Sequence, residues 1–378
     1  MNRMRRVTIV GGGIIGLSCA WRLARDGWRV TLLDGAPEAR EASWAAAGML
    51  APHHEAHGPG PLWRLGIDSL ARWPGFVEDL GITPATVDLH LAGGLMPVLS
   101  DADAAEVAER QRFLSAHGIS ARWLDSAEMR RHEPAITGDC AGALLLPGGQ
   151  VNPRLVCTRL QAAASEAGAT IRYHTPVTGI SAGGDSGASG ANGNSGDSNV
   201  TLGDGEVIPG DEVILASGAW TPGLAALAGI ELAGEPVKGQ MLRLRAADGL
   251  LSRFVHCQHA YLVPRAGLGL VVGATMVTAG FDKSDDPGAI ERLAAGARRL
   301  VPTLADAPIV EHWTGLRPRI AHGQPVIARV RPGLIIATGH FRNGILLTPI
   351  TADAVVELCG GPACGVDLSP FTLQKTST

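Results

Sequence analysis

The stretch Val7-Thr8-Ile9-Val10-Gly11-Gly12-Gly13-Ile14-Ile15-Gly16 decides the fold of this chain. A short run of mostly β-branched residues predicts a strand, and the glycines that follow predict a tight turn into a helix. Gly27 stands where a helix ends in a left-handed residue, and residues 29–33 predict a second strand that ends at Asp34. Strand, helix and strand form a βαβ unit, which implies a parallel sheet covered by helices.

The turn has the spacing of a dinucleotide-binding loop. Gly11 permits the tight turn, Gly13 lets the backbone approach a pyrophosphate, and Gly16 lets the helix pack closely on the strand. The pyrophosphate then lies at the helix N-terminus, where free N–H groups and the helix dipole favour negative charge. Asp34 is placed to accept hydrogen bonds from ribose hydroxyls, which disfavours the 2′-phosphate of NADP. The motif by itself does not distinguish FAD from NAD.

Two further segments favour FAD. The small residues of 42–49 suit a backbone that runs close under a flat ring system, although the same composition is typical of an alanine-rich helix start. Residues 334–347 predict a strand, a polar turn flanked by glycines and a helix, and so a second helix N-terminus that can face an anion or a flavin edge. An NAD-dependent dehydrogenase is the alternative, and it explains the first loop but not this second segment.

The length of 378 residues favours two domains. Dinucleotide-type elements occur at the start, the middle and the end of the chain, with mixed sheet elements between them. We therefore predict an α/β fold in which a discontinuous, Rossmann-like FAD-binding domain carries an inserted mixed-sheet α+β substrate domain. The predicted FAD-binding domain comprises residues 1–85, 150–228 and 317–378, and the substrate domain comprises residues 86–149 and 229–316.

Residues 181–199 are almost wholly Gly, Ser, Asn, Asp and Ala. They predict a long, flexible hairpin loop and not an interdomain linker, because strand-like residues resume at 200–202. A helix over 62–80 is expected to break at Pro74. Further helices are predicted over 101–116, 151–167 and 289–300, and further strands over 95–99, 170–174, 206–208, 211–217, 261–264 and 270–273.

The composition excludes several classes of protein. The formal net charge is -4 and no basic stripe occurs, so nucleic acid and anionic membranes are not expected partners. The 6 cysteines show no CxxC spacing, which indicates free thiols in a reducing compartment. Arg3, Arg5 and Arg6 precede an apolar run that is too short for a signal peptide, and no stretch reaches the roughly 18 apolar residues of a spanning helix. We expect a cytoplasmic protein.

A cluster of histidines offers a competing kind of site. His53-His54-Glu55-Ala56-His57 brings together side chains that can bind zinc. Pro52 and Gly58 flank the cluster, however, and its spacing is not that of a helical zinc motif. We therefore predict no metal site here.

Several segments together form a family pattern: Val10–Gly16, Ala45–Met49, Tyr261–Arg265, Val271–Met276, Trp313–Pro318 and Gly339–Leu347. The pattern resembles that of the bacterial glycine oxidases, within the D-amino-acid oxidase and sarcosine oxidase superfamily, and it spans nearly the whole chain. The resemblance implies non-covalent FAD and oxidative deamination of glycine, sarcosine or small D-amino acids, with oxygen as the electron acceptor. It also implies a homotetramer and a role in thiamine biosynthesis, where the glycine imine enters thiazole formation.

The resemblance also implies roles for individual residues. Trp44 stands where we expect the family to have a small polar residue, and the 181–199 segment has no counterpart in the family pattern. The implied substrate residues are Arg317, Arg342, Tyr261, Met276 and His259. Beside the glycines of the first loop, the implied FAD contacts are Ile14, Ile15, Asp34, Gly35, Ala42, Ser43, Ala47, Gly48, Met49, Val177, His340, Phe341, Arg342, Asn343, Gly344, Ile345 and Leu346.

The chemistry of such a site favours two of the arginines. A substrate carboxylate must be held while the α-carbon faces flavin N5, and a guanidinium group binds a carboxylate in bidentate fashion. Arg317 lies in a mostly apolar run, and Arg342 lies among apolar residues that include Phe341 and Ile345. We therefore expect both to bind the substrate and not to be ordinary surface arginines. Arg319 is expected to be structural. We predict no general base, because hydride transfer from Cα needs none when the amine arrives neutral.

Some assignments stay open. The Tyr261 hydroxyl can bond the substrate carboxylate or the ring can simply pack in a strand, His259 can lie at the surface, and Met276 can belong to the core. An FAD-dependent D-amino-acid or D-hydroxyproline dehydrogenase that uses a non-oxygen acceptor is the main alternative activity. A catalytically silent flavin-binding protein is another, and Arg317 and Arg342 argue against it.

Overall fold

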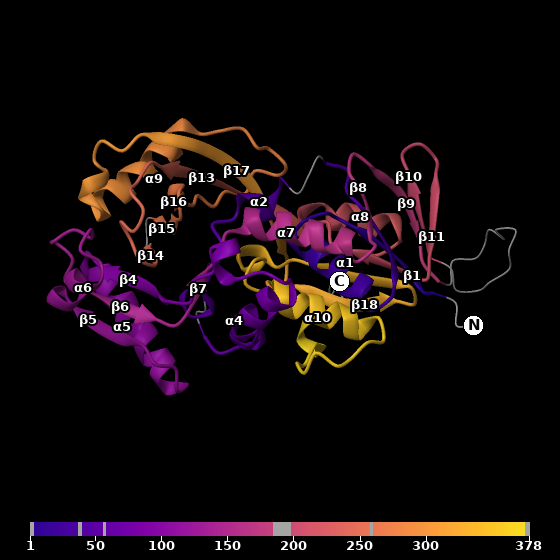
Figure 1. Cartoon of the computed structure of the whole chain (residues 1–378), viewed down its shortest axis with the longest axis horizontal. Coiled ribbons are helices and arrows are strands. Elements are labelled where there is room, and N and C mark those ends of the chain that lie inside the picture. The colour runs from indigo at the N-terminus through magenta and orange to yellow at the C-terminus, as the bar shows by residue number, and fades with distance from the viewer. Residues whose placement is uncertain (1–3, 37–39, 56–57, 184–197, 258–259, 375–378) are drawn as a thin grey trace, which may run out of the picture. The chain divides into compact units, whose positions relative to one another are not determined.

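The computed structural model describes residues 4–36, 40–55, 58–183, 198–257 and 260–374 (Figure 1). The chain forms two compact units, each made of segments that are separate in the sequence. Unit 1 comprises residues 1–44, 156–237 and 316–378, and unit 2 comprises residues 45–155 and 238–315.

A six-stranded sheet forms the centre of unit 1, in the order β18-β19-β12-β1-β2-β8. β1 pairs in parallel with β2 on one side and with β12 on the other. The chain passes from β1 to β2 and β8 and then returns to β12 on the opposite side of β1. Doubly wound sheets bind ligands at such a reversal, outside the carboxyl ends of the strands. The strands are β1 (Arg6–Val10), β2 (Arg29–Leu33), β8 (Thr170–Arg172), β12 (Glu212–Leu215), β18 (Val326–Arg331) and β19 (Leu334–Thr338).

Helices and a small sheet cover this central sheet. β19 is buried along its whole length, as expected for a strand inside a largely parallel sheet. One core cluster joins the sheet to α8 (Thr221–Leu227) and to the three-stranded sheet β11-β10-β9. α1 (Ile14–Arg25) and α10 (Thr348–Leu358) pack against each other, and α10 also contacts β18 and β19 (Figure 1). The small sheet comprises β9 (Val177–Ser181), β10 (Ser198–Leu202) and β11 (Val207–Gly210).

Unit 2 contains most of an eight-stranded mixed sheet, in the order β17-β13-β16-β15-β14-β4-β6-β5. Along β4, Leu95 joins one core cluster while Met96 and Val98 join another, which is the alternation of a strand buried on both faces. The first cluster includes α9 (Pro287–Leu300), and the second includes residues of α4 (Pro61–Asp79) and α5 (Asp101–Ala116). The strands are β4 (Gly94–Val98), β5 (Arg122–Asp125), β6 (Gly142–Leu146), β13 (Gly234–Leu244), β14 (Phe254–Cys257), β15 (Ala260–Arg265), β16 (Gly269–Gly273) and β17 (Ile309–Ile320).

The α/β fold predicted from the sequence is confirmed, and so are its first strand, helix and strand. The hairpin expected around 181–199 is also confirmed, because β9 and β10 pair antiparallel with Ser181 opposite Asn199. Residues 184–197 of that loop lie outside the described residues. The other elements are α2 (Ala42–Ala45), β3 (Met49–Leu50), α3 (Pro52–Glu55), η1 (Pro84–Val87), α6 (Ser126–His132), β7 (Gly149–Gln150), α7 (Pro153–Glu166), η2 (Gly218–Trp220), η3 (Pro302–Leu304), η4 (Phe341–Asn343) and η5 (Ser369–Phe371).

The predicted break of a helix at Pro74 is wrong. α4 runs without interruption from Pro61 to Asp79, with Pro74 inside it. Trp73 and Phe76, close to the proline, are 0% and 2% exposed. Burial of such side chains contributes about 1.5–3 kcal/mol each, which offsets the roughly 3 kcal/mol that an interior proline costs a helix.

The boundaries of the two units differ from the boundaries of the predicted domains. Residues 45–85 and 150–155, predicted to belong to the FAD-binding domain, fall in unit 2, and residues 229–237 fall in unit 1. β3 pairs with β7, and both strands belong to unit 2. The assignment of FAD binding and substrate binding to particular ranges stays a prediction. Among the described residues, no helix is both long enough and apolar enough to span a membrane.

We expect Gly16→Ala to destabilise unit 1, because a Cβ at Gly16 would lie 1.8 Å from the carbonyl oxygen of Gly11. Overpacking against backbone costs about 1–3 kcal/mol, so the thermal unfolding midpoint should fall by on the order of 5 °C. Gly223→Ala on α8 is the control, since nothing lies within 4 Å of its Cβ position. It should keep or raise the midpoint, and equal midpoints for the two variants would contradict this account.

Candidate cofactor and substrate site

The glycine turn after β1 leaves no room for side chains. Gly11 has φ +116°, and a Cβ there would lie 2.5 Å from the carbonyl oxygen of Ala216, which follows β12. The turn therefore lies at the reversal of strand order, between β1 and β12. Gly13 caps α1 and brings no side chain to the helix terminus, while Ile14 N donates to Ser43 Oγ at 2.9 Å. Backbone N–H groups and the helix dipole thus face the position where a pyrophosphate would lie.

Asp34 lies at the carboxyl end of β2, beside the same turn. Its Oδ2 accepts from Gly12 N at 2.6 Å, and its Oδ1 accepts from Ala36 N at 2.8 Å. These backbone donors fix the carboxylate in one orientation, and Asp34 is half-buried. The cradle of the turn and the held carboxylate fit the pyrophosphate and ribose of a dinucleotide, and the individual contacts stay a prediction.

The predicted flavin-facing segment 42–49 is a short helix followed by a tightly held backbone. α2 covers Ala42–Ala45, so the first half is the alanine-rich helix start that the composition allowed. Gly48 has φ +77°, and a Cβ there would lie 2.0 Å from the carbonyl oxygen of Val151. Trp313 Nε1 donates to the carbonyl oxygen of Ala45 at 2.9 Å. Trp44 is half-buried within α2.

The second predicted cofactor segment, 339–347, connects β19 to α10. The helix begins at Thr348, later than the sequence suggested, and a 3₁₀ turn over Phe341–Asn343 precedes it. His340 is buried with its Nε2 3.0 Å from Thr351 Oγ1, and burial lowers its pKa to about 4. Arg342 is exposed, whereas Ile345 and Leu346 are buried.

Two further implied FAD contacts belong to unit 1. Gly35 is exposed, and Val177 is half-buried at the start of β9.

The implied substrate residues lie in both units. Arg317, half-buried on β17, and Arg342 belong to unit 1. Tyr261, half-buried on β15, and Met276, 59% exposed, belong to unit 2. The Tyr261 hydroxyl lies 3.7 Å from Met241 Sδ. His259 lies outside the described residues. Their roles in substrate binding stay predictions.

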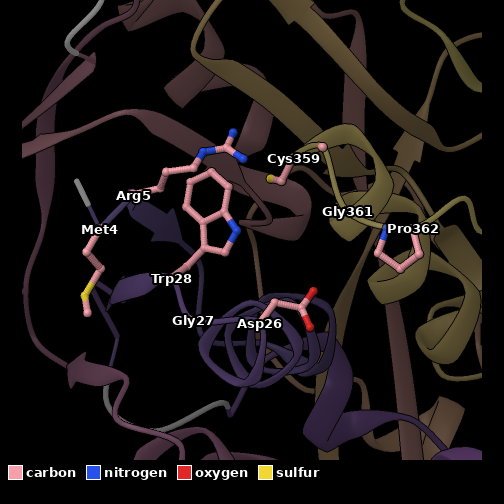
Figure 2. Close-up of a pocket in the computed structure, with 9 residues that line it drawn as sticks. Met4, Arg5, Asp26, Gly27, Trp28, Cys359, Gly361 and Pro362 are labelled. Carbon is pink, nitrogen blue, oxygen red and sulfur yellow. The ribbon is translucent and has the colours of Figure 1, made fainter. Parts of the chain in front are cut away.

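A surface hollow of unit 1 is lined by residues outside the predicted cofactor loop (Figure 2). Arg5 and Trp28 line it, and they directly precede β1 and β2 at the amino ends of these strands. The Arg5 guanidinium carbon lies 3.9 Å from the centre of the Trp28 ring, and Cys359 at the C-terminal end of α10 also lines the hollow. The glycine turn lies at the carboxyl ends of the same strands, so the hollow is not the predicted site.

The histidine cluster considered for zinc is partly described. His53 and His54 are buried in α3, and His53 Nδ1 accepts from Trp63 Nε1 at 3.2 Å. The His54 ring centre lies 4.8 Å from that of Phe254 and 6.0 Å from that of His256. His57 lies outside the described residues. Within the part of the chain that is described, no three His, Cys, Asp or Glu side chains are grouped as metal ligands.

Two side chains that touch the predicted flavin-facing backbone were given no role by the sequence. Trp313 reaches the carbonyl oxygen of Ala45, and Arg265 donates to that of Ala47. Both residues stand inside segments of the family pattern. The signal that could have found Arg265 is a charge at the end of an apolar strand, which requires a buried partner.

The sheet order, the Gly11–Gly16 turn and the Asp34 carboxylate define a dinucleotide-binding α/β protein. The profile of the family described as FAD dependent oxidoreductase (DAO) matches residues 6–358. The chain belongs to this family, and its cofactor is FAD. This confirms the choice of FAD over NAD that the sequence favoured.

Known proteins similar to this chain cover nearly all of it. A glycine oxidase of Geobacillus kaustophilus is 33% identical over 99% of this chain and 98% of the relative. The crystal structure of glycine oxidase from Geobacillus kaustophilus has a TM-score of 0.88 to this chain at 31% identity, covering 99% of this chain and 100% of that chain. A bifunctional protein ThiO/ThiG of Synechocystis sp. is 35% identical over 95% of this chain, which covers 52% of that protein.

Asp34→Ala is expected to weaken FAD binding, because it removes a charged acceptor held at the ribose position by Gly12 N and Ala36 N. A hydrogen bond to a charged group contributes about 1.5–3 kcal/mol, so the Kd for FAD should rise by roughly tenfold or more. Asp26→Ala, an exposed residue that caps the other end of α1, is the control. Titration of apoprotein with FAD measures both, and an unchanged Kd for Asp34→Ala would refute the ribose assignment.

Buried histidines should make the protein less stable in mild acid. Burial is the main cause that lowers the pKa of His54 well below 6.5 and that of His53 from 6.5 to about 4. Between those values the unfolded chain binds more protons than the folded one. The free energy of unfolding therefore keeps its full value above pH 6.5 and falls as the pH drops toward 4. The loss is at most about 1.4 kcal/mol per pH unit for each histidine.

Urea unfolding of the apoprotein at about pH 7.5 and pH 5.5 measures this loss. His54→Leu should lose less stability between the two pH values than the unmodified protein. His132→Gln, an exposed histidine at the end of α6, is the control and should behave like the unmodified protein. The same loss in all three proteins would show that His54 does not carry the effect.

Proposed function

We propose that this protein oxidises the Cα–N bond of glycine and of related small amines, such as sarcosine and small D-amino acids. The observation that carries the proposal is the likeness to glycine oxidases along almost the whole chain, at 33% identity over 99% of it. The amine loses two electrons and two protons to give an imine, and water converts the imine to a 2-oxo acid and ammonia or an amine. Oxygen takes up the two electrons and two protons as hydrogen peroxide.

In this proposal the protein supplies orientation and charge. Arg317 binds the substrate carboxylate in bidentate fashion, and Arg342 lies in the turn that faces the cofactor. The Tyr261 hydroxyl adds a hydrogen bond to the carboxylate, and Met276 and His259 line the pocket. FAD, held without a covalent link, would supply the acceptor for the hydride that leaves Cα. No side chain acts as a general base, because the amine binds in its neutral form.

The cofactor contacts belong to the same proposal. The turn from Gly11 to Gly16 cradles the pyrophosphate, and Asp34 binds the ribose. The contacts with the rest of FAD come from Gly35, Val177 and the segments 42–49 and 340–346. The close approach of Gly16 to Gly11 supports this assignment, because a Cβ at Gly16 would lie 1.8 Å from the Gly11 oxygen.

We extend the proposal to the protein's setting. The likeness to the ThiO/ThiG protein and the family resemblance support a role in thiazole formation for thiamine. The family resemblance supports a homotetramer. The described residues contain no disulfide, which supports a reducing compartment such as the cytoplasm.

A screen for peroxide release tests the activity. The substrates are glycine, sarcosine, D-alanine, D-proline and the hydroxyproline isomers, and we expect peroxide from glycine and sarcosine. Turnover that appears only with an artificial electron acceptor would instead indicate the D-amino-acid or D-hydroxyproline dehydrogenase. No turnover with any acceptor, and no change in the flavin spectrum on adding these amines, would indicate a silent flavin-binding protein.

Arg317→Ala should remove the carboxylate clamp. We expect kcat/KM for glycine to fall by on the order of a hundredfold, because a bidentate charged pair is lost. Arg319→Ala is the matched control two residues along the same strand, where the guanidinium pairs with Glu235. Its kcat/KM should stay close to that of the unmodified enzyme. Equal losses in both variants would remove the special role of Arg317.

A further inference from the structure

One buried arginine of unit 2 reaches the backbone at the predicted flavin-facing segment. Arg265, at the end of β15, is 4% exposed. Its Nη2 donates to the carbonyl oxygens of Ala47 and, at 2.7 Å, of Val151. Its Nη1 donates to Asp88 Oδ2 at 3.1 Å. One guanidinium group therefore links β15, the Ala47–Gly48 peptide and the start of the chain that leads into α7.

Asp88 holds the guanidinium from the other side. It is 7% exposed and takes a left-handed conformation, with φ 53°, directly after η1. Its Oδ1 lies 2.8 Å from His90 Nε2, so both carboxylate oxygens have partners. Burial lowers the pKa of Arg265 to about 10 in spite of this neighbour, and the group is fully charged at neutral pH.

A buried ion pair of this kind is a weak source of stability. Removing two charges from water costs several kcal/mol per ion, and apolar side chains of similar volume often stabilise a protein as much or more. What the pair supplies is a fixed arrangement of hydrogen bonds. The two arms of a guanidinium point in set directions, so the position of Asp88 determines where the Ala47 carbonyl must lie.

Gly48 lies so close to the guanidinium that a side chain there would have no room. A Cβ there would lie 2.9 Å from Arg265 Nη2, and Val151 N donates to Gly48 O at 2.9 Å. A trans peptide places its C=O and N–H on opposite sides. With the Ala47 carbonyl turned toward Arg265, the Gly48 N–H must point away from the guanidinium.

We propose that Arg265, held by Asp88, is a positioning residue for the flavin: it fixes the plane of the Ala47–Gly48 peptide, so that the Gly48 N–H faces the flavin ring. The inference rests on the proposed contact between FAD and Ala47–Met49. A peptide N–H at a fixed place beside the ring stabilises negative charge on the reduced flavin. Loss of the pair should therefore change FAD affinity and the reduction potential of the bound flavin.

The test replaces the pair by neutral side chains of similar size, Arg265→Met with Asp88→Asn. The matched control is Arg253→Met with Glu133→Gln, a second pair in unit 2 with Nε 3.0 Å from Glu133 Oε1. Arg253 also donates to a backbone carbonyl, that of Ala92, at 3.0 Å. Both double variants lose a similar ion pair, so a merely structural role predicts the same change in both.

Three properties are measured without substrate: the unfolding midpoint of the apoprotein, the Kd for FAD, and the reduction potential of the bound flavin. We expect the Arg265/Asp88 variant to raise the Kd by about tenfold and to lower the potential. The Arg253/Glu133 variant should change only the midpoint. The inference is overturned if the Arg265/Asp88 variant keeps the Kd and potential of the unmodified protein.

Arg265→Lys decides the matter if the double variant does not fold. It keeps the charge, but its single nitrogen cannot occupy the positions of Nη1 and Nη2 at once, so the fixed arrangement of the hydrogen bonds is lost. We expect the same direction of change in Kd and potential at a smaller size, and values equal to those of the unmodified protein overturn the inference. Because no amine is added, failure of the proposed glycine oxidation leaves this result unaffected, and the two failures are distinguishable.

Discussion

The structure of unit 1 depends on the contact between the first turn of α1 and the loop that precedes it. Gly16 lies so close to the carbonyl oxygen of Gly11 that a single methyl group would collide with the backbone at 1.8 Å. This contact lets the helix begin directly at the end of β1, where β12 lies on one side and β2 on the other. The N–H groups of the helix and the Asp34 carboxylate therefore meet at the carboxyl ends of these strands, where the strand order reverses. Binding of a dinucleotide follows from that arrangement.

Local patterns in the sequence predicted those parts of the fold that depend on local forces. The βαβ unit and the hairpin around 181–199 were readable because strand alternation, helical spacing and glycine turns act over a few residues. The continuity of α4 through Pro74 was not, because the aromatic burial that offsets the proline depends on contacts far along the chain. The helix α10 begins only at Thr348, later than the sequence suggested, because a 3₁₀ turn at Phe341–Asn343 and the residues up to Leu347 come before it.

The candidate site divides in the same way. The glycines and Asp34 form a motif with fixed spacing, so the sequence alone could propose them, and their geometry fits a pyrophosphate and ribose. The role that we propose for Arg265 was not readable, because its partner Asp88 lies 177 positions away in the chain. The apolar strand that ends at Arg265 indicates a buried charge, but no local pattern identifies the carboxylate that pairs with it. Arg317 and Arg319 are both half-buried on β17, and the ion pair of Arg319 with Glu235 is not visible in the local sequence.

The central claim is that a small amino acid delivers electrons to the FAD of this protein. Anaerobic addition of glycine to the holoprotein, followed by the visible absorbance of the flavin, tests it most directly because no electron acceptor other than FAD takes part. The account predicts that glycine bleaches the flavin absorbance and that admission of oxygen restores it. A flavin that stays oxidised with glycine, sarcosine and small D-amino acids, while dithionite reduces it fully, would contradict the account.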